Sequence, residues 1–194
     1  MPRTRSFDPD VVVDAAVEQF WTASYRATST EDLCESSSLS RSSLYNTFGS
    51  KRELYLRALR RYVQRKQEQR VDLMEQPLTG RDLVAAIGHS LIVEQWDDAS
   101  RRACLGINAC IEIGPSEPDI TTMLETNAAD FDAMLEIGIR RGQADGSVRD
   151  DLDPHALARA VHAAFDGLQV RARVAPSDDV VHADVETLLA MLER

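Results

Sequence analysis

The segment from Thr28 to Lys51 constrains the fold most, because signals for three helix starts are packed into about two dozen residues. Residues 35–40 read Glu-Ser-Ser-Ser-Leu-Ser, a stretch rich in residues that favour caps and turns over helix interiors. So short a connection leaves room only for a tight turn. Two short helices must therefore meet at a steep angle, which is the pattern of a helix-turn-helix.

Each of the three starts has a physical signature. Thr28 with Glu31, and Ser50 with Glu53, fit the S/T-x-x-E capping box. In this motif a hydroxyl and a carboxylate satisfy backbone N–H groups that have no partner within the helix. Ser40 supplies a simpler N-cap. In DNA-binding versions of this arrangement the second helix enters the major groove, while the first helix and the caps hold phosphates.

The distribution of charge supports a nucleic-acid partner although the whole chain is acidic. The net charge of −10 would by itself argue against phosphate binding. Residues 1–70, however, hold 12 Lys and Arg against 9 Asp and Glu, whereas residues 71–194 hold 10 against 23. Basic character is therefore concentrated where the helix-turn-helix is predicted, and the acidic remainder is expected to face away from DNA.

Eight basic residues follow the helix-turn-helix directly: Lys51, Arg52, Arg57, Arg60, Arg61, Arg65, Lys66 and Arg70. For those beyond Arg57 the preferred interpretation is a solvated helix face. Arg3 and Arg5 precede the domain, either as an arm that reaches a minor groove or, as we prefer, as a disordered tail.

Hydrophobic periodicity predicts an all-α fold of about nine helices. The N-terminal helix-turn-helix domain is expected to cover 1–50, and a helical effector-binding and dimerisation domain 51–194, with the helix over 51–75 linking them. The expected helices span about 7–24, two short stretches within 28–50, and then 51–75, 79–97, 101–113, 118–141, 154–174 and 177–192.

Several classes of protein are disfavoured by the sequence. No apolar run reaches the roughly 18 to 20 residues of a membrane span, and the charged first ten residues lack the apolar core of a secretory signal. Three irregularly spaced cysteines favour a reducing cytoplasm. No metalloprotease, hydrolase or phosphate-loop motif occurs, and the four histidines show no metal-ligand spacing. We expect no enzymatic activity and no cofactor.

The first 65 or so residues resemble the DNA-binding domain of the TetR family of transcriptional repressors. A second segment, residues 102–108, is similar to a motif of the AcrR-like branch of that family. Ser24 and Ser38 stand where the family often has glycine. The residues that carry the main resemblance are Phe20, Tyr25, Ala27, Thr28, Ser29, Leu33, Leu39 through Tyr45, Phe48, Ser50, Lys51 and Leu54.

The resemblance implies roles for residues around the predicted turn. Tyr45 and Lys51 are expected to grip phosphates on either side of the second helix. Arg41 is the best candidate to read a base, through guanine O6 and N7, with a phosphate contact as the alternative. Leu33, Leu44 and Phe48 are better explained as core. The complete set of predicted DNA contacts is Thr28, Ser29, Arg41, Ser42, Ser43, Tyr45, Asn46 and Lys51.

Two apolar stripes near the C-terminus predict how the protein dimerises. Adjacent amphipathic helices at the end of a chain can meet their symmetry mates in a four-helix interface, as the family does. A two-fold dimer predicts a palindromic operator with half-sites about 10 bp apart. The predicted interface residues are Leu157, Val161, Phe165, Leu168, Val181, Val185, Leu188 and Leu192.

The identity of an effector is less constrained. Asn108 and Asn127 lie on otherwise apolar helix faces, and such polar groups need a partner, either a ligand or another protein group. A fairly apolar small molecule is the modest expectation. The candidate pocket residues are Trp96, Cys104, Asn108, Met123, Asn127, Phe131 and Phe165.

Taken together, the sequence predicts a cytoplasmic, homodimeric regulator that binds double-stranded DNA. The preferred interpretation is a repressor that an unknown small molecule releases from DNA, and an activator is left open. One alternative is a redox or electrophile sensor that uses Cys104, with a thiolate stabilised by Arg101 and Arg102. Another is a helical adaptor that has lost DNA binding.

Overall fold

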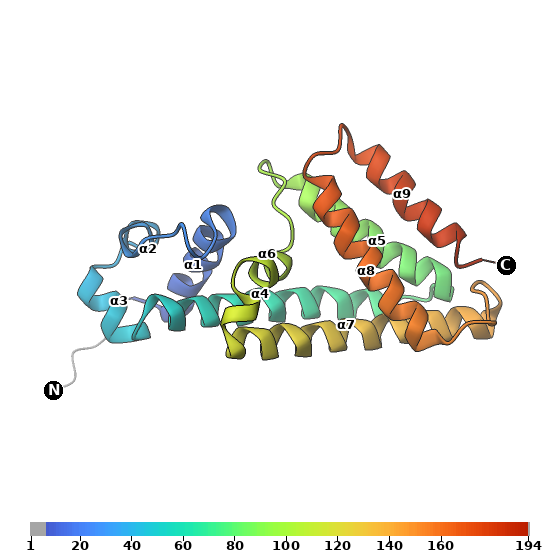
Figure 1. The fold of residues 1–194 in the computed structure, drawn as a ribbon, viewed down its shortest axis with the longest axis horizontal. Helices are drawn as coiled ribbons and strands as arrows, with labels where there is room; N and C mark the ends of the chain where they lie inside the picture. Colours follow the sequence, from blue (N-terminus) through green and yellow to red (C-terminus); the bar gives the residue numbers. More distant parts are fainter. Residues whose placement is uncertain (1–6, 194) are drawn as a thin grey trace.

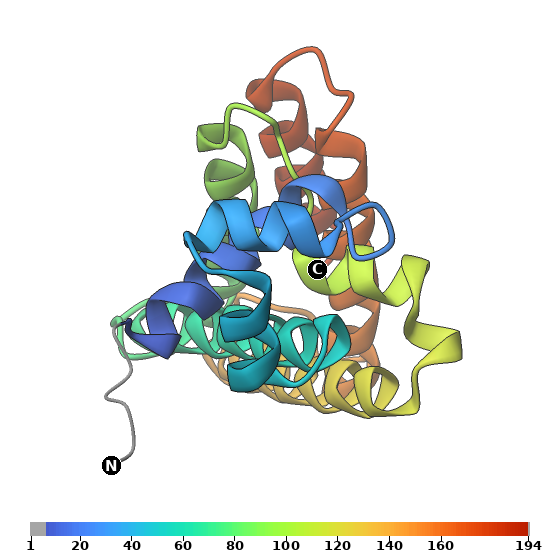
Figure 2. The same cartoon turned by 90° about the vertical axis from the view of Figure 1, so that its left-hand side faces the viewer.

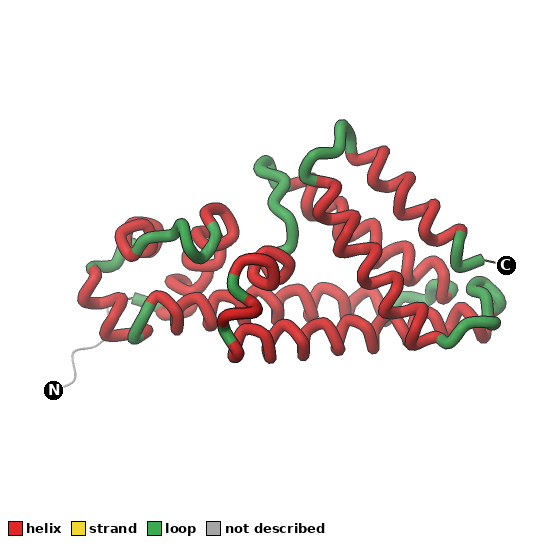
Figure 3. Tube along the Cα trace, viewed as in Figure 1, coloured by secondary structure: helices red, strands yellow, loops and turns green. Residues whose placement is uncertain are grey.

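The protein is all-α, as predicted. The computed structural model describes residues 7–193, and every regular element in that range is a helix (Figures 1 and 3). Arg3 and Arg5 lie outside the described residues. The elements in chain order are α1 (Pro9–Ala23), α2 (Thr30–Ser37), α3 (Arg41–Phe48), α4 (Lys51–Met74), α5 (Gly80–Asp97), α6 (Leu105–Glu112), the short 3₁₀ helix η1 (Gly114–Ser116), α7 (Pro118–Asp145), α8 (Pro154–Ala172) and α9 (Asp178–Ala190).

The molecule is elongated, and its two longest helices lie side by side along its length. Helices α4 and α7 form this base, with α1, α2 and α3 at one end and α5, α8 and α9 over the other (Figure 1). Helix α6 lies between the two groups. Figure 2 views the molecule from the end that carries α2 and α3. None of the described helices is long and apolar enough to cross a bilayer.

Two hydrophobic cores hold the helices together. The first joins α1–α3 to the N-terminal half of α4, and it extends through Leu105 and Ala109 of α6 to Ile120 of α7. The second is built from α5, α7, α8 and α9. The first core therefore crosses position 50, where the sequence suggested a boundary. Helix α4 packs against both cores, the second through Leu73 and Met74 near its C-terminal end.

The helix caps correct one detail of the predicted helix-turn-helix. The box at the start of α2 is formed by Ser29 and Asp32, one residue later than the predicted pair of Thr28 and Glu31. The Ser29 hydroxyl accepts from the Asp32 amide at 3.1 Å, and the Asp32 carboxylate accepts from the Ser29 amide at 2.7 Å. At Ser50 only half of the predicted box forms: its hydroxyl accepts from the Glu53 amide at 3.1 Å, while the Glu53 carboxylate accepts from Arg52 Nη1 at 3.0 Å.

The two serines at glycine-like positions adopt the backbone expected there. Ser24 has φ 69° and Ser38, which ends α2, has φ 55°. Positive φ is costly for residues with a Cβ atom, so both turns are strained relative to a glycine turn. The helix-turn-helix geometry is kept despite the substitutions.

Two predicted helix boundaries were wrong for identifiable reasons. The segment 101–104 is not helical, because its backbone forms a hydrogen bond to another part of the chain: Trp21 Nε1 donates to the Ala103 carbonyl at 2.7 Å. Helix α7 continues to Asp145 instead of stopping near Gly142. A Cβ atom on Gly80 would lie 1.9 Å from the backbone nitrogen of Gly142, so these glycines permit close packing of α5 on α7. The helix ends instead at Gly146, where φ is 82°.

Candidate DNA interface and effector site

The helix-turn-helix is held by a small apolar core. Leu33 of α2 packs with Leu44 and Phe48 of α3, and all three side chains are at most 3% exposed. This confirms their predicted core role. Ser40 caps α3 by accepting from the amide of Ser43 at 3.2 Å. The capped, buried side of α3 therefore fixes which of its residues point outward.

The outward face of α3 carries four of the eight residues predicted to meet DNA. Arg41, Ser42, Tyr45 and Asn46 are exposed, whereas Ser43 is half-buried and its hydroxyl accepts from Ser40 at 2.9 Å. This face offers a guanidinium, hydroxyls and a carboxamide to solvent. These groups can donate to base edges or to phosphate oxygens.

Arg41 is already engaged by a neighbour on α2. Its Nη1 lies 2.9 Å from Oε1 of Glu31, and its guanidinium lies 5.8 Å from the centre of the Tyr45 ring. Both side chains of the ion pair are more than 60% exposed, so the pair contributes little to stability. Glu31 holds Arg41 at the surface without preventing it from binding a stronger partner.

The flanking residue Tyr45 is positioned by α2, and Lys51 by the connection between α1 and α2. The Tyr45 hydroxyl lies 3.2 Å from the Thr30 hydroxyl, and this hydrogen bond, followed by that with Arg41, lowers the pKa of Tyr45. Lys51 Nζ donates to the Thr28 carbonyl at 2.5 Å and lies 4.6 Å from the centre of the Tyr25 ring. An ammonium has three donors, so Lys51 keeps donors for a phosphate.

Thr28 differs from the role expected of it. Its side chain is 1% exposed, and its hydroxyl donates to the Ser24 carbonyl at 2.6 Å. Its hydroxyl is therefore used inside the protein. At the start of α2, Ser29 is exposed and Thr30 is half-buried. Thr30 was not among the residues predicted to contact DNA. A capping box shifted by one residue, at Ser29 and Asp32, is the signal that identifies it.

The basic residues along α4 divide into two groups. Arg61 and Arg65 both contact Asp14 of α1, at 3.1 and 2.7 Å, on a partly exposed face. Lys66 and Arg70 do not follow the solvated-face interpretation. Lys66 forms an ion pair with Glu94 of α5, and the Arg70 guanidinium lies 4.0 Å from the centre of the Phe131 ring.

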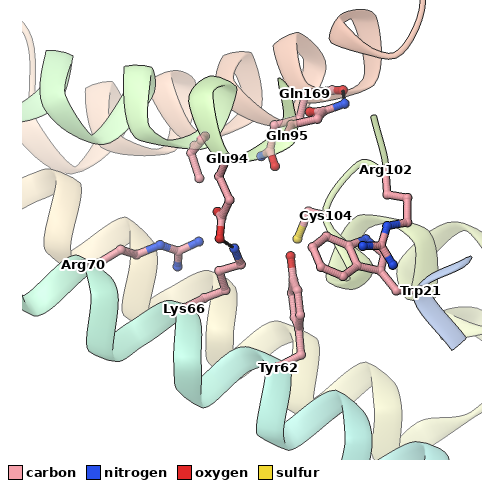
Figure 4. A pocket seen from close by; sticks show the side chains of 10 residues that line it. Trp21, Tyr62, Lys66, Arg70, Glu94, Gln95, Arg102, Cys104 and Gln169 are labelled. Carbon is pink, nitrogen blue, oxygen red and sulfur yellow. Dashed lines mark hydrogen bonds and ion pairs between the residues drawn. The ribbon is translucent and has the colours of Figure 1, made fainter. Parts of the chain in front are cut away.

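Lys66 and Arg70 line a cavity where the two halves of the molecule meet (Figure 4). Its interior has room for about one water molecule, since most of the roughly 310 Å³ between its atoms is open solvent or too narrow for water. Tyr62 and Lys66 rise into it from α4, and Glu94 and Gln95 reach it from α5 on the opposite side (Figure 4). The lining residues are Trp21, Tyr62, Lys66, Arg70, Leu91, Glu94, Gln95, Arg102, Cys104 and Gln169.

Of the predicted pocket residues, only Cys104 lines this cavity. Met123 and Asn127 line a separate groove between α4 and α7, and Asn108 lies in a hollow beside α1. Asn127 Oδ1 is buried without a hydrogen-bond partner. Its need for a partner was predicted, but residues 7–193 supply none.

The remaining three predicted pocket residues pack into the second core. Phe131 and Phe165 are 4% and 1% exposed, and Trp96 packs against the same core beneath Arg101, whose guanidinium is 3.9 Å from the indole centre. The predicted residues therefore do not form one site. The cavity is also lined by charged groups, and the expectation of a fairly apolar effector stays a prediction.

The sequence missed most of the cavity. Tyr62, Lys66 and Arg70 recur every four residues and so share one face of α4, and Gln95 interrupts an otherwise apolar face of α5. That spacing was a usable signal. It was obscured because a run of basic residues on a long helix usually faces solvent.

The two apolar stripes predicted to form the dimer interface are buried within the protomer. The prediction therefore named the wrong residues for the interface. Seven of the eight side chains are at most 9% exposed, and Leu188 is partly buried against the same core. The stripes pack α8 and α9 onto α5 and α7. The opposite faces of these helices carry exposed small or apolar residues instead, and Val174 after α8 and Met191 after α9 are also exposed. These residues are Ala160, Ala163, Gly167 and Val170 on α8, and Val180 and Ala183 on α9.

Two histidines that are far apart in sequence lie together on the surface. Nδ1 of His89 is 2.7 Å from Nδ1 of His182, and Nε2 of His89 is 2.6 Å from Glu186. Within the part of the chain that the structure describes, no group of three or more side chains is arranged to hold a metal ion.

Comparison with known proteins identifies relatives that match both halves of the chain. Residues 12–58 match the model described as bacterial regulatory proteins of the tetR family, and residues 82–188 match the tetracyclin repressor-like C-terminal domain. Two curated relatives are each 28% identical. One is the uncharacterized HTH-type transcriptional regulator YezE of Bacillus subtilis strain 168, aligned over the whole of both chains. The other is the HTH-type transcriptional repressor ComR of Escherichia coli K12, aligned over 88% of this chain and 82% of ComR.

A solved structure also matches over almost the full length. It is a cysteine mutant of the TetR family regulator CifR in complex with 26 bp double-strand operator DNA. The TM-score is 0.84 at 28% identity, with 97% of this chain and 98% of that chain covered. The C-terminal match alone spans more than half of the 194 residues. The chain therefore belongs to the TetR family of DNA-binding transcriptional regulators.

Proposed function

We propose that the protein is a homodimeric repressor that binds a palindromic operator through α3 and is released from it by a small-molecule effector. The observation that carries the proposal is the exposed face of α3, with Arg41, Ser42, Tyr45 and Asn46 held outward by a buried core. A comparable fold in complex with operator DNA supports it.

The roles at this interface follow from side-chain chemistry. Arg41 is proposed to read a guanine, because its planar guanidinium can donate to O6 and N7 together. Tyr45, Lys51 and Ser29 are proposed to bind phosphates, the last with backbone donors at the start of α2. Ser42, Ser43 and Asn46 are proposed as further groove contacts.

Dimerisation is proposed to use the outward faces of α8 and α9. The small side chains of Ala163 and Gly167 allow a close approach of helices, and a Cβ atom on Gly167 would meet nothing within 4 Å inside the protomer. Exposed Val174, at 86%, and Met191, at 67%, add apolar area just beyond the ends of the same helices. A two-fold axis through these faces would pair the two α3 helices on a symmetric operator.

Effector control is proposed to act at the junction between the halves. Trp21 of α1 and Arg102 of the segment before α6 form one wall of the cavity, and Lys66 of α4 forms another. Glu112 of α6 also accepts from the backbone amides of Tyr25 and Arg26, at 3.0 and 2.7 Å. A ligand with different affinities for two arrangements of this junction would change the separation of the α3 helices.

We further propose that the protein acts in the cytoplasm and without enzymatic activity. Its operator lies in that compartment, and its relatives are transcriptional regulators. The three cysteines are free thiols, which fits a reducing compartment.

Fluorescence anisotropy of the full chain on duplex DNA, recorded across a range of salt concentrations, tests the proposal. We expect Lys51→Gln to weaken binding to all sequences and to lower the salt slope by about 1. Arg41→Ala is expected to relax specificity at one base pair at a cost of about 1–3 kcal/mol. Binding that neither change affects would contradict the assigned interface.

Cys104 supports a second candidate, a regulator that senses oxidants or electrophiles. Its thiol lines the cavity and contacts the Tyr62 hydroxyl. The predicted partners of a thiolate are occupied elsewhere, because Arg102 bonds Asp98 and Glu18, and Arg101 bonds the Ala175 carbonyl. Release of operator DNA by oxidant in the wild type, and not in Cys104→Ser, would favour this candidate over reversible ligand binding.

A further inference from the structure

Glu31, in the first turn of α2, places a carboxylate beside Arg41, the first residue of α3. Its Oε1 lies 2.9 Å from Nη1 of Arg41, across the turn that separates the two helices. The other carboxylate of the same turn belongs to Asp32 and accepts from the Ser29 amide in the cap of α2. Residues 36–52 contain neither aspartate nor glutamate. Glu31 therefore brings a negative charge to a face that otherwise offers cations and neutral donors.

Two partners hold the guanidinium of Arg41. Glu31 accepts from its Nη1, and the Tyr45 hydroxyl, which also lies 3.2 Å from the Thr30 hydroxyl, forms a second hydrogen bond with Arg41. A guanidinium has five N–H donors, so at least three remain for another molecule. Guanine O6 and N7 need only two of them. Arg41 can therefore bind a guanine while it stays attached to α2.

The Glu31 carboxylate makes the two possible DNA targets of Arg41 unequal. A phosphate bound to Arg41 would come close to this carboxylate, and like charges repel. A guanine edge offers acceptors without a net charge, so it meets no such repulsion. Both side chains of the ion pair are more than 60% exposed, so the repulsion is screened by salt and amounts to a factor of about three.

We propose that Glu31 is a positioning residue for sequence readout, which directs Arg41 to guanine and away from phosphate. Glu31 thereby lowers the affinity for non-operator DNA more than the affinity for the operator, because non-specific binding depends on phosphate contacts. It acts through Arg41 and touches no base itself. The inference rests on the proposed operator binding through α3, and it gives α2 a part in the choice of sequence.

Fluorescence anisotropy at low salt, on the selected operator and on a shuffled duplex of equal length, tests the proposal. Glu31→Gln removes the charge and keeps an acceptor for Arg41. We expect it to raise the affinity for the shuffled duplex about threefold and the affinity for the operator less than twofold, with the difference shrinking as salt is added. The urea midpoint should stay that of the wild type, because an exposed ion pair contributes little to stability.

Glu35→Gln is the matched control, because it removes the same charge from an exposed position four residues later on α2. It should change both affinities by the same factor. An equal rise on both duplexes in Glu31→Gln would show general repulsion alone and would overturn the proposal.

Arg41→Ala tests whether Glu31 acts through the arginine. Adding Glu31→Gln to this variant should leave the ratio of the two affinities within twofold, because no guanidinium is then left to position. Selection with Glu31→Gln should relax the same base pair that Arg41→Ala relaxes. A full threefold change in the Arg41→Ala background would overturn the proposal, as would relaxation at a different base pair, since Glu31 would then read that base itself.

Selection by the wild type separates this inference from the proposed function. Recovery of no operator would overturn the proposed function. Recovery of an operator, together with an unchanged ratio of affinities in Glu31→Gln, would overturn the role of Glu31 and leave the regulator intact.

Discussion

The indole Nε1 of Trp21 in α1 donates a 2.7 Å hydrogen bond to the backbone carbonyl of Ala103, which lies 82 residues later in the chain. Ala103 is buried in the segment between α5 and α6. The guanidinium of Arg102 in the same segment lies 4.2 Å from the centre of the Trp21 ring. The DNA-binding half is therefore attached to the effector half by side-chain contacts as well as by the continuous helix α4.

Trp21→Phe is expected to destabilise the protein by about 1–3 kcal/mol, because it leaves the Ala103 carbonyl without a donor. Urea unfolding measures the change. Trp96→Phe is the matched control, since Trp96 packs against the second core and the structure shows no hydrogen bond from its indole within residues 7–193. Equal losses in the two variants would show that the hydrogen bond contributes nothing beyond the loss of ring area.

Ala163→Arg is expected to convert the dimer to a monomer without unfolding it. Ala163 is exposed on α8, so a large charged side chain fits the protomer but not a helix interface. Light scattering at micromolar concentration measures the mass, and operator affinity should fall with it because one protomer contacts only one half-site. Ala129→Arg on the exposed side of α7 should remain dimeric. A dimeric Ala163→Arg protein would place the interface elsewhere.

Ser38→Gly is expected to stabilise the helix-turn-helix by about 0.5–1 kcal/mol, because Ser38 pays the penalty of a left-handed backbone that glycine avoids. Calorimetry measures the midpoint. Ser36→Gly, two residues earlier within α2, should instead lose about 0.5–1 kcal/mol, since glycine weakens a helix interior. A destabilised Ser38→Gly variant would contradict this penalty, and would mean that the serine side chain itself stabilises the turn.

Asp145 is expected to make stability depend on pH in the acid range. The hydroxyl of Ser147, followed by the backbone amides of Gly80 and Ser147, lowers the pKa of Asp145. A carboxyl whose pKa is lowered in the folded state stabilises the protein at pH values above its unfolded-state pKa of about 4. This contribution is lost as the pH falls through the folded-state pKa. Asp145→Asn should therefore be less stable than the wild type at pH 6, with the gap closing toward pH 2. A gap that stays constant with pH would exclude this titration as its cause.

Local patterns predicted the fold well because caps and helical periodicity are written in neighbouring residues. Ser40, Ser50 and the apolar face of α1 each determine their own element with little help from distant contacts. The DNA contacts were expected from the family resemblance and stay predictions, whereas the box at the start of α2 lies one residue later than its spacing suggested.

The cavity and the dimer faces could not be predicted in this way. Arg70 meets Phe131, and Gln95 meets Gln169, only because α4, α5, α7 and α8 pack together. The stripe that includes Val161 and Val185 was read as an interface, although intramolecular packing on α5 and α7 buries it equally well. Amphipathicity shows that a face is covered, but not by which partner.

Selection of bound duplexes from a random pool by the protein at low salt tests whether a dimer reads DNA through α3. We expect enrichment of a palindromic sequence whose half-sites lie about 10 bp apart. We also expect the same selection with Arg41→Ala to relax the sequence at one symmetric pair of positions. Recovery of no palindrome by the wild type would contradict a dimeric protein that reads DNA through α3.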